Sequence, residues 1–247
     1  MTYLTQSYAS GTSDVPLIGA TIGAQFDTAV ARWGARDALI VRQQDIRWSW
    51  VDLKERVDAF AAGLMDIGLD PGSRIGIWAP NRTEWTITQF ATAKAGLILV
   101  NINPTYRLAE LEYALNKVGC TALVTAAAFK TSDYLGMIRD LAPELDTATP
   151  GELQAVRLPD LRHVIQVGGG DVPGTWAFED ILVHGKAAGQ AAVEALAPSL
   201  QFDDPINIQF TSGTTGSPKG ATLTHHNILN NGFFVGRAQA LGEDDRI

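Results

Sequence analysis

The residues best suited to chemistry lie together at positions 209–220, which read QFTSGTTGSPKG. They combine one cation, Lys219, with a set of hydroxyls and glycines. That set is Thr211, Ser212, Thr214, Thr215, Ser217, Gly213, Gly216 and Gly220. Glycines let backbone N–H groups come close to a ligand, and successive N–H groups in a turn form a concavity that binds anions. Hydroxyls and an ammonium group add charge-assisted hydrogen bonds. The stretch therefore predicts a phosphate-binding loop.

The best-known phosphate loop, the P-loop of NTPases, does not fit these residues. That motif is Gly-x-x-x-x-Gly-Lys followed by Ser or Thr, and it opens directly into a helix. Here two residues separate Gly216 from Lys219, and Gly220 stands where Ser or Thr would bind magnesium. Residues 206–210 and 221–223, on either side of the loop, both have the composition of strands. We therefore expect a strand–loop–strand element.

The rest of the chain alternates between the hydrophobic periods of strands and helices. Strands alternating with helices of 10–15 residues indicate βαβ units and a parallel sheet covered by helices on both faces. We therefore expect an α/β fold, preceded by a flexible arm at 1–16. The expected strands are 37–41, 46–48, 74–79, 97–101, 121–125, 163–167, 206–210 and 221–223. The expected helices are 21–33, 50–67, 84–95, 108–118, 186–197 and 227–240, the last capped by Thr224.

Composition narrows the class of protein. The chain has 247 residues, of which 46% are hydrophobic and 19% charged, as in an ordinary globular protein. A net charge of −8 without a basic stripe argues against nucleic-acid binding. Cys120 is the single cysteine, which excludes disulfides within the chain. The first basic side chain is Arg32, and no apolar run reaches membrane-spanning length. We therefore expect a cytoplasmic protein without a transmembrane segment.

Several other residues invite a functional reading, and a structural role is expected for each. The adjacent His225 and His226 would face different directions in a helix, so we expect capping or packing, with a substrate contact as the alternative. Residues 103–107 follow a buried strand, where α/β sites often sit, but a structural turn is the expected role. His163 and His184 have no evident partners in the sequence. Core packing is expected for Cys120, Trp48, Trp50, Trp78 and Trp85.

At every position, residues 211–220 resemble the signature of the adenylate-forming (AMP-binding) enzymes, a superfamily that includes acyl-CoA synthetases and luciferases. This likeness disfavours a plain surface turn. It extends over 17–247, which resembles the N-terminal part of an AMP-binding domain. Blocks 103–119 and 204–223 are most similar to the medium-chain acyl-CoA synthetase branch. Further segments that resemble the superfamily are SWVDL at 49–53, KAG at 94–96, VNINP at 100–104 and THHN at 224–227.

The resemblance implies an acid–thiol ligase. Such enzymes bring a carboxylate against the α-phosphate of Mg-ATP, release pyrophosphate and form an acyl-adenylate, which the thiolate of coenzyme A then attacks. A fatty acid, ATP, Mg²⁺ and coenzyme A are therefore the expected substrates and cofactors. Lys219 and Thr215 are the implied catalytic residues, and no metal ligand is assigned. The implied nucleotide-binding residues are Thr211, Ser212, Gly213, Thr214, Thr215, Gly216, Ser217, Pro218 and Lys219.

The printed residues resemble only the first part of such enzymes. Segments that line the acyl pocket, contact adenine and ribose, or form the C-terminal lid have no counterpart in 1–247. We therefore expect the 247-residue chain alone to be inactive. Two alternatives stay open: an adenylating enzyme for an aryl, amino or luciferin-like acid, and a non-catalytic binding module or remnant built from the same half-fold.

Overall fold

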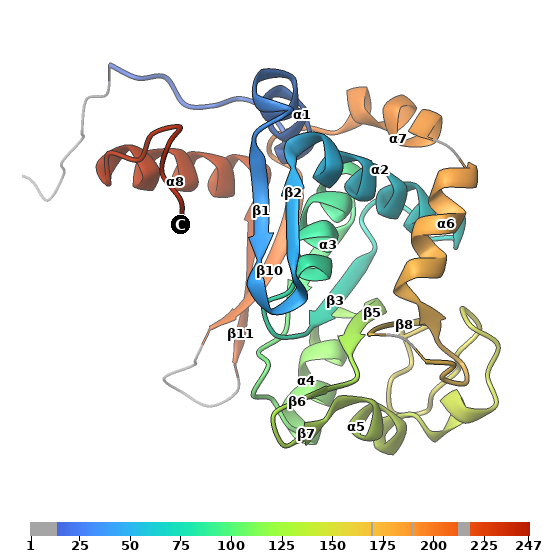
Figure 1. Ribbon diagram of the computed structural model, residues 1–247. Helices are drawn as coiled ribbons and strands as arrows, with labels where there is room; N and C mark the ends of the chain where they lie inside the picture. The colour runs from blue at the N-terminus through green and yellow to red at the C-terminus, as the bar shows by residue number, and fades with distance from the viewer. Residues whose placement is uncertain (1–13, 169, 189, 212–217) are drawn as a thin grey trace, which may run out of the picture.

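A seven-stranded sheet forms the centre of the computed structural model, which describes residues 14–168, 170–188, 190–211 and 218–247 (Figure 1). All neighbouring strands in it run parallel except the last pair at one edge, which is antiparallel. The expected α/β fold with a parallel-type sheet is therefore confirmed. In spatial order the strands are β11 (Lys219–Thr224), β10 (Pro205–Thr211), β4 (Ile98–Asn101), β3 (Arg74–Trp78), β5 (Cys120–Ala126), β8 (His163–Val167) and β9 (Trp176–Ala177).

Helices cover both faces of this sheet. The connection from β3 to β4 moves one place along the sheet, and the connection from β4 to β5 moves two places back. Because parallel crossovers are right-handed, the helices in these two connections lie on opposite faces. They are α3 (Thr83–Lys94) and α4 (Leu108–Val118). The other helices are α1 (Ile22–Trp33), α2 (Trp50–Asp66), α5 (Tyr134–Leu141), α6 (Phe178–Ala188), α7 (Gln190–Leu196) and α8 (His225–Ala238).

Smaller elements connect these parts. The hairpin of β1 (Asp37–Val41) and β2 (Ile46–Ser49) forms a separate two-stranded sheet, as do β6 (Ala128–Phe129) and β7 (Ser132–Asp133). Single 3₁₀ turns are η1 (Arg42–Gln44), η2 (Pro143–Asp146) and η3 (Ala197–Ser199). None of the helices in the described ranges has the length and apolarity to cross a membrane.

Local chemistry explains where the helices begin and end. The Ser49 hydroxyl accepts from the backbone N–H of Asp52, and the Asp52 carboxylate accepts from the N–H of Ser49, which is a capping box at the start of α2. Helix α4 ends at Gly119, whose φ of 61° is left-handed and favours glycine. Thr224 caps α8 in the same reciprocal way with Asn227. The three termini lie within three residues of the sequence expectation.

The core is centred on the middle strands. Trp78 at the end of β3 is fully buried, and its ring stacks on Tyr134 with centroids 3.7 Å apart. Cys120 opens β5, and burial raises the pKa of its thiol to about 12. The expected packing roles of Cys120 and Trp78 are confirmed, and Trp48, Trp50 and Trp85 pack against the same core.

A charge network joins the helices that cover one side of the core. The Lys94 side chain is 7% exposed, and its ammonium nitrogen lies 2.5 Å from a carboxylate oxygen of Asp58 and 2.9 Å from one of Asp27. Lys54 pairs with the same two carboxylates. These residues come from α1, α2 and α3, so the network fixes the three helices relative to one another. Lys94, which opens one of the segments shared with the superfamily, therefore has a structural role.

Candidate phosphate-binding site

The predicted phosphate loop lies between two paired strands at the edge of the sheet. Strand β10 ends at Thr211, strand β11 begins at Lys219, and the two residues pair across the antiparallel ladder. The two strands expected on either side of the loop are therefore confirmed (Figure 1). Six of the predicted binding residues lie outside the described residues: Ser212, Gly213, Thr214, Thr215, Gly216 and Ser217.

The described rim of the loop presents groups suited to an anion. Thr211 and Lys219 are both exposed, and the Thr211 hydroxyl lies 3.4 Å from the Lys219 carbonyl. Both residues lie where β10 ends, and the carboxyl ends of parallel strands are where open α/β sheets bind ligands. A hydroxyl and an ammonium fit phosphate oxygens. Among the described residues, no group of three or more His, Cys, Asp and Glu side chains could hold a metal ion.

Helix α4 contacts Pro218, the residue that precedes β11. The Tyr113 hydroxyl donates to the carbonyl of Pro218 at 3.0 Å. The Tyr113 ring also lies against Phe210 of β10, with centroids 6.4 Å apart. Sequence analysis missed Tyr113, since nothing in the pattern of α4 separates it from an ordinary half-buried helix residue.

The two histidines after β11 are structural. His225 is buried, and its Nδ1 accepts from the backbone N–H of Ile22 at 3.1 Å. Burial lowers the pKa of His225, and the nearby Asp204 opposes this only in part. The backbone N–H of His226 donates to Phe202, whose ring packs on the imidazole. The expected packing is thus confirmed for both histidines, whereas the cap of α8 is made by Thr224 and Asn227.

The polar loop after β4 is a structural turn, as expected. The side-chain oxygen of Asn103 accepts from the backbone N–H and the hydroxyl of Thr105. The backbone carbonyl of Asn103 accepts from the Trp78 indole N–H at 3.1 Å. The Tyr134 hydroxyl donates to the Pro104 carbonyl at 2.6 Å. These bonds give Asn103, Pro104 and Thr105 partners within the fold.

The remaining two histidines, His163 and His184, also have structural environments that the fold explains. His163 opens β8 and is buried, which lowers its pKa. His184, whose partners are not evident in the sequence, has two in the structure. Its Nδ1 lies 3.4 Å from an Asp66 carboxylate oxygen, and its ring meets the edge of Trp176. This contact joins α6 to α2 and carries no catalytic geometry.

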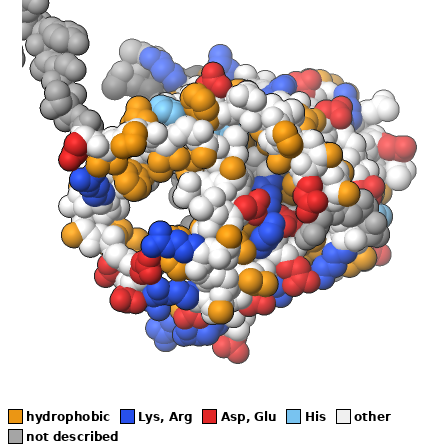
Figure 2. All heavy atoms as spheres, turned by 90° about the horizontal axis from the view of Figure 1, so that it is seen from above, with side chains coloured by type: hydrophobic (Ala, Val, Ile, Leu, Met, Phe, Trp, Pro, Cys, Tyr) orange, Lys and Arg blue, Asp and Glu red, His pale blue; other side chains and the backbone are white. Residues whose placement is uncertain are grey.

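An open groove of about 1260 Å³ lies beside β10 and α8. Aromatic side chains line it, including Trp33, Trp85 and Phe233, and none of the described residues in its wall is charged. Asn207 lies in this wall, almost fully buried, and its carboxamide atoms have no hydrogen-bond partner in the described chain. Seen from above, the molecule is hollowed next to a gathering of hydrophobic side chains (Figure 2). A neutral surface of this kind does not suit the phosphates of a nucleotide.

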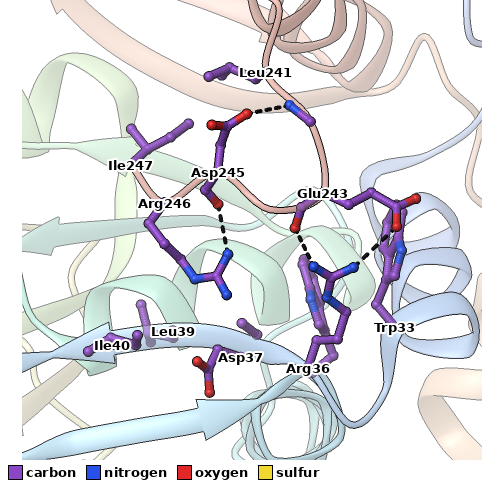
Figure 3. A pocket seen from close by; sticks show the side chains of 13 residues that line it. Trp33, Arg36, Asp37, Leu39, Ile40, Leu241, Glu243, Asp245, Arg246 and Ile247 are labelled. Carbon is purple, nitrogen blue, oxygen red and sulfur yellow. Dashed lines mark hydrogen bonds and ion pairs between the residues drawn. The ribbon is translucent and has the colours of Figure 1, made fainter.

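A second hollow, of about 690 Å³, lies between β1 and residues 241–247 (Figure 3). Arg36 points to Glu243 across its mouth at 3.2 Å and also pairs with Asp244 at 2.8 Å. Arg32 pairs with the same Glu243. The charges of Arg32 and Arg36 are thus paired with carboxylates, whereas Arg246, which also lines the hollow, donates to the backbone carbonyls of Asp244 and Asp245.

The chain matches known proteins along nearly its whole length. The family model described as "AMP-binding enzyme" matches residues 26–247. The medium-chain acyl-CoA ligase ACSF2, mitochondrial, of Danio rerio is 46% identical over 233 residues, and that of Mus musculus is 47% identical over 232. Each match covers 94% of this chain and 38% of the relative. The putative acyl-CoA synthetase YngI of Bacillus subtilis (strain 168) is 36% identical, over 42% of its length.

Solved structures share the fold. A long-chain-fatty-acid-CoA ligase (FadD1) from Archaeoglobus fulgidus superposes with a TM-score of 0.72 at 21% identity, covering 97% of this chain and 43% of that one. A putative long-chain-fatty-acid CoA ligase from Rhodopseudomonas palustris CGA009 gives the same TM-score and identity, covering 92% and 50%. Together with the family model, these matches lead to one conclusion: the chain belongs to the AMP-binding enzyme family.

Proposed function

We propose that the chain is the N-terminal part of an AMP-forming acyl-CoA ligase that activates a medium-chain fatty acid. The observation that carries this proposal is the 46–47% identity to medium-chain acyl-CoA ligases across 94% of the chain. The chain spans 38% of the length of those relatives, so the activity proposed is that of a larger protein. Cytoplasmic residence stays a prediction, and the named vertebrate relatives are mitochondrial.

In the proposed reaction a carboxylate attacks the α-phosphate of ATP, and pyrophosphate leaves. Coenzyme A thiolate then attacks the acyl carbonyl of the acyl-adenylate, the bond to the AMP phosphate breaks, and the thioester and AMP are formed. Mg²⁺ bound to the ATP phosphates would neutralise part of their charge. In this proposal the chain contributes residues 211–216, which would hold the β- and γ-phosphates. Lys219 would stabilise the charge that builds up on the leaving pyrophosphate.

The test is ATP–pyrophosphate exchange with octanoate, measured on the protein made from the complete reading frame that contains residues 1–247. Lys219→Gln should lower the exchange rate by roughly 10- to 100-fold, because a hydrogen bond to a charged group contributes about 1.5–3 kcal/mol. Lys117→Gln removes the same charge from an exposed position on α4 and should leave the rate unchanged.

Two outcomes would contradict the proposal. One is faster exchange with an aryl or amino acid than with octanoate, and the other is an undiminished rate in Lys219→Gln. The 247-residue chain serves as a further comparison, and on its own it is expected to give no exchange. Clear turnover by that chain would refute the expected inactivity.

A further inference from the structure

The hydrogen bond from Tyr113 to Pro218 connects two parts of the chain that are 105 residues apart. The paired part of the β10–β11 hairpin ends at the pair of Thr211 and Lys219, so Pro218 is the first residue beyond the ladder. Proline has no N–H to donate, which leaves its carbonyl as the only backbone group that can be held there. Tyr113 therefore extends the anchorage of the hairpin by one residue.

The same side chain also packs on the stem of the hairpin. Its ring meets Phe210 at an interplanar angle of 60°. Phe210 pairs across the ladder with Gly220, where a Cβ would lie 3.7 Å from both Phe210 and Val118 of α4. Helix α4 thus contacts both strands of the stem, and Tyr113 reaches from the stem to the loop.

The geometry points to Tyr113 as a positioning residue for Lys219. The Pro218 carbonyl and the Lys219 N–H belong to one planar peptide unit, so holding the oxygen fixes the direction of the N–H. It also fixes the point from which the Lys219 side chain leaves the backbone. Tyr113 itself touches no phosphate in this arrangement and acts through Lys219. The inference rests on the proposed function, because it assigns Lys219 to pyrophosphate.

A second bond of the same kind supplies a matched control. Tyr134 donates to the carbonyl of Pro104 at 2.6 Å, outside the β10–β11 hairpin, and its ring stacks on Trp78 in the core. Like Tyr113→Phe, the substitution Tyr134→Phe removes a hydroxyl that donates to a proline carbonyl. Of the two, only Tyr113→Phe changes a residue that contacts the phosphate-binding element.

Tyr113→Phe should lower kcat/KM for MgATP in ATP–pyrophosphate exchange by about three- to tenfold, which corresponds to the loss of one ordinary hydrogen bond. Tyr134→Phe should lower the denaturation midpoint and leave kcat/KM within about twofold. In the Tyr113→Phe, Lys219→Gln double variant, the tyrosine change should add nothing to the loss from the lysine change. Non-additivity of this kind marks residues that act together.

Hydrogen exchange separates failure of the inference from failure of the proposed function. Tyr113→Phe should speed the exchange of amides in residues 219–224, whether or not the protein catalyses adenylation, and Tyr134→Phe should not. Unchanged amide exchange in Tyr113→Phe would overturn the positioning role. Additive losses in the double variant would overturn it as well. Absence of ATP–pyrophosphate exchange in the wild type, combined with faster amide exchange in Tyr113→Phe, would refute the reaction and leave the anchor standing.

Discussion

The two sides of the central sheet differ sharply in burial. All five residues of β8 are buried, and β3 and β5 are nearly so. At the β11 edge of the sheet, by contrast, no residue of β11 is buried, and four of its six residues are exposed. Strands covered on both faces are selected for packing. An exposed antiparallel edge keeps hydroxyls, an ammonium and main-chain groups free to meet a ligand. The buried core therefore lies on the middle strands, whereas the proposed phosphate site lies at the exposed edge.

The largest effect that tests this comparison should come from the buried side. Trp78→Ala should lower the free energy of unfolding by about 3–5 kcal/mol, because it removes a fully buried indole stacked on Tyr134. Urea denaturation followed by circular dichroism measures it. Trp78→Phe, which keeps a ring, should lose clearly less. A loss below about 1 kcal/mol in Trp78→Ala would mean that the centre is not where stability resides.

An intermediate effect should depend on pH and arise where α8 meets α1. Burial lowers the pKa of His225 below its ordinary 6.5, so the folded state prefers the neutral ring. The unfolded state binds more protons, and stability therefore rises with pH across this range. The contribution is complete above pH 6.5 and is lost as the pH falls through the lower pKa of the folded state.

His225→Asn keeps an acceptor for the Ile22 N–H and removes the titration. The fall in unfolding free energy between pH 7.5 and 5.5 should therefore be smaller in this variant than in the wild type. His163, whose pKa is also lowered by burial, is present in both proteins and leaves a residual slope. Equal slopes in the two proteins would show that the His225 contact is not coupled to folding.

The smallest effect should come from the exposed edge. Thr222 lies on β11, opposite Ile208, with its side chain exposed. Thr222→Ala should change the free energy of unfolding by less than about 0.5 kcal/mol, as for most surface substitutions. The same urea denaturation as for Trp78 applies. A loss above 2 kcal/mol would place the edge among the stabilising elements and break the comparison.

Elements with strong local signals could be predicted from the sequence. The limits of α4 and β8 match the expectation residue for residue, because caps and apolar period agree there. Helix α5 was missed, although Leu135, Ile138 and Leu141 have helical spacing and Asp133 caps it. It is only eight residues long and follows two short strands, so its signal is brief.

Most of α6, residues 178–185, lies outside the expected helix at 186–197 for a different reason. Gly185 lies inside α6 and lowers its helix propensity. In the structure a Cβ at Gly185 would lie 1.6 Å from the Ala59 carbonyl of α2, and one at Gly63 would lie 2.1 Å from that of Ile181. These glycines allow the two helices to touch. Only the tertiary structure contains that information.

The candidate site divides in the same way. The phosphate-binding role of the loop residues is predicted from their types and spacing, and the flanking strands are predicted from β propensity. The bond between Tyr113 and Pro218 could not be predicted, because it joins distant segments and needs the relative position of α4 and the hairpin. Residues 212–217 of the loop lie outside the described residues, so their assignment stays a prediction.

The parallel pairing of β10 with β4 has a consequence for the order of folding. Strands β3, β4 and β5 are joined by short crossovers, whereas the chain completes β5, α5, β8 and α6 before β10 returns to pair with β4. Closing such a long loop is slow, because its entropy cost precedes any contact energy. Until β10 arrives, β4 presents a bare edge that can pair with another molecule. The hairpin that would bind phosphate is thus also the cover that protects the nascent sheet from aggregation.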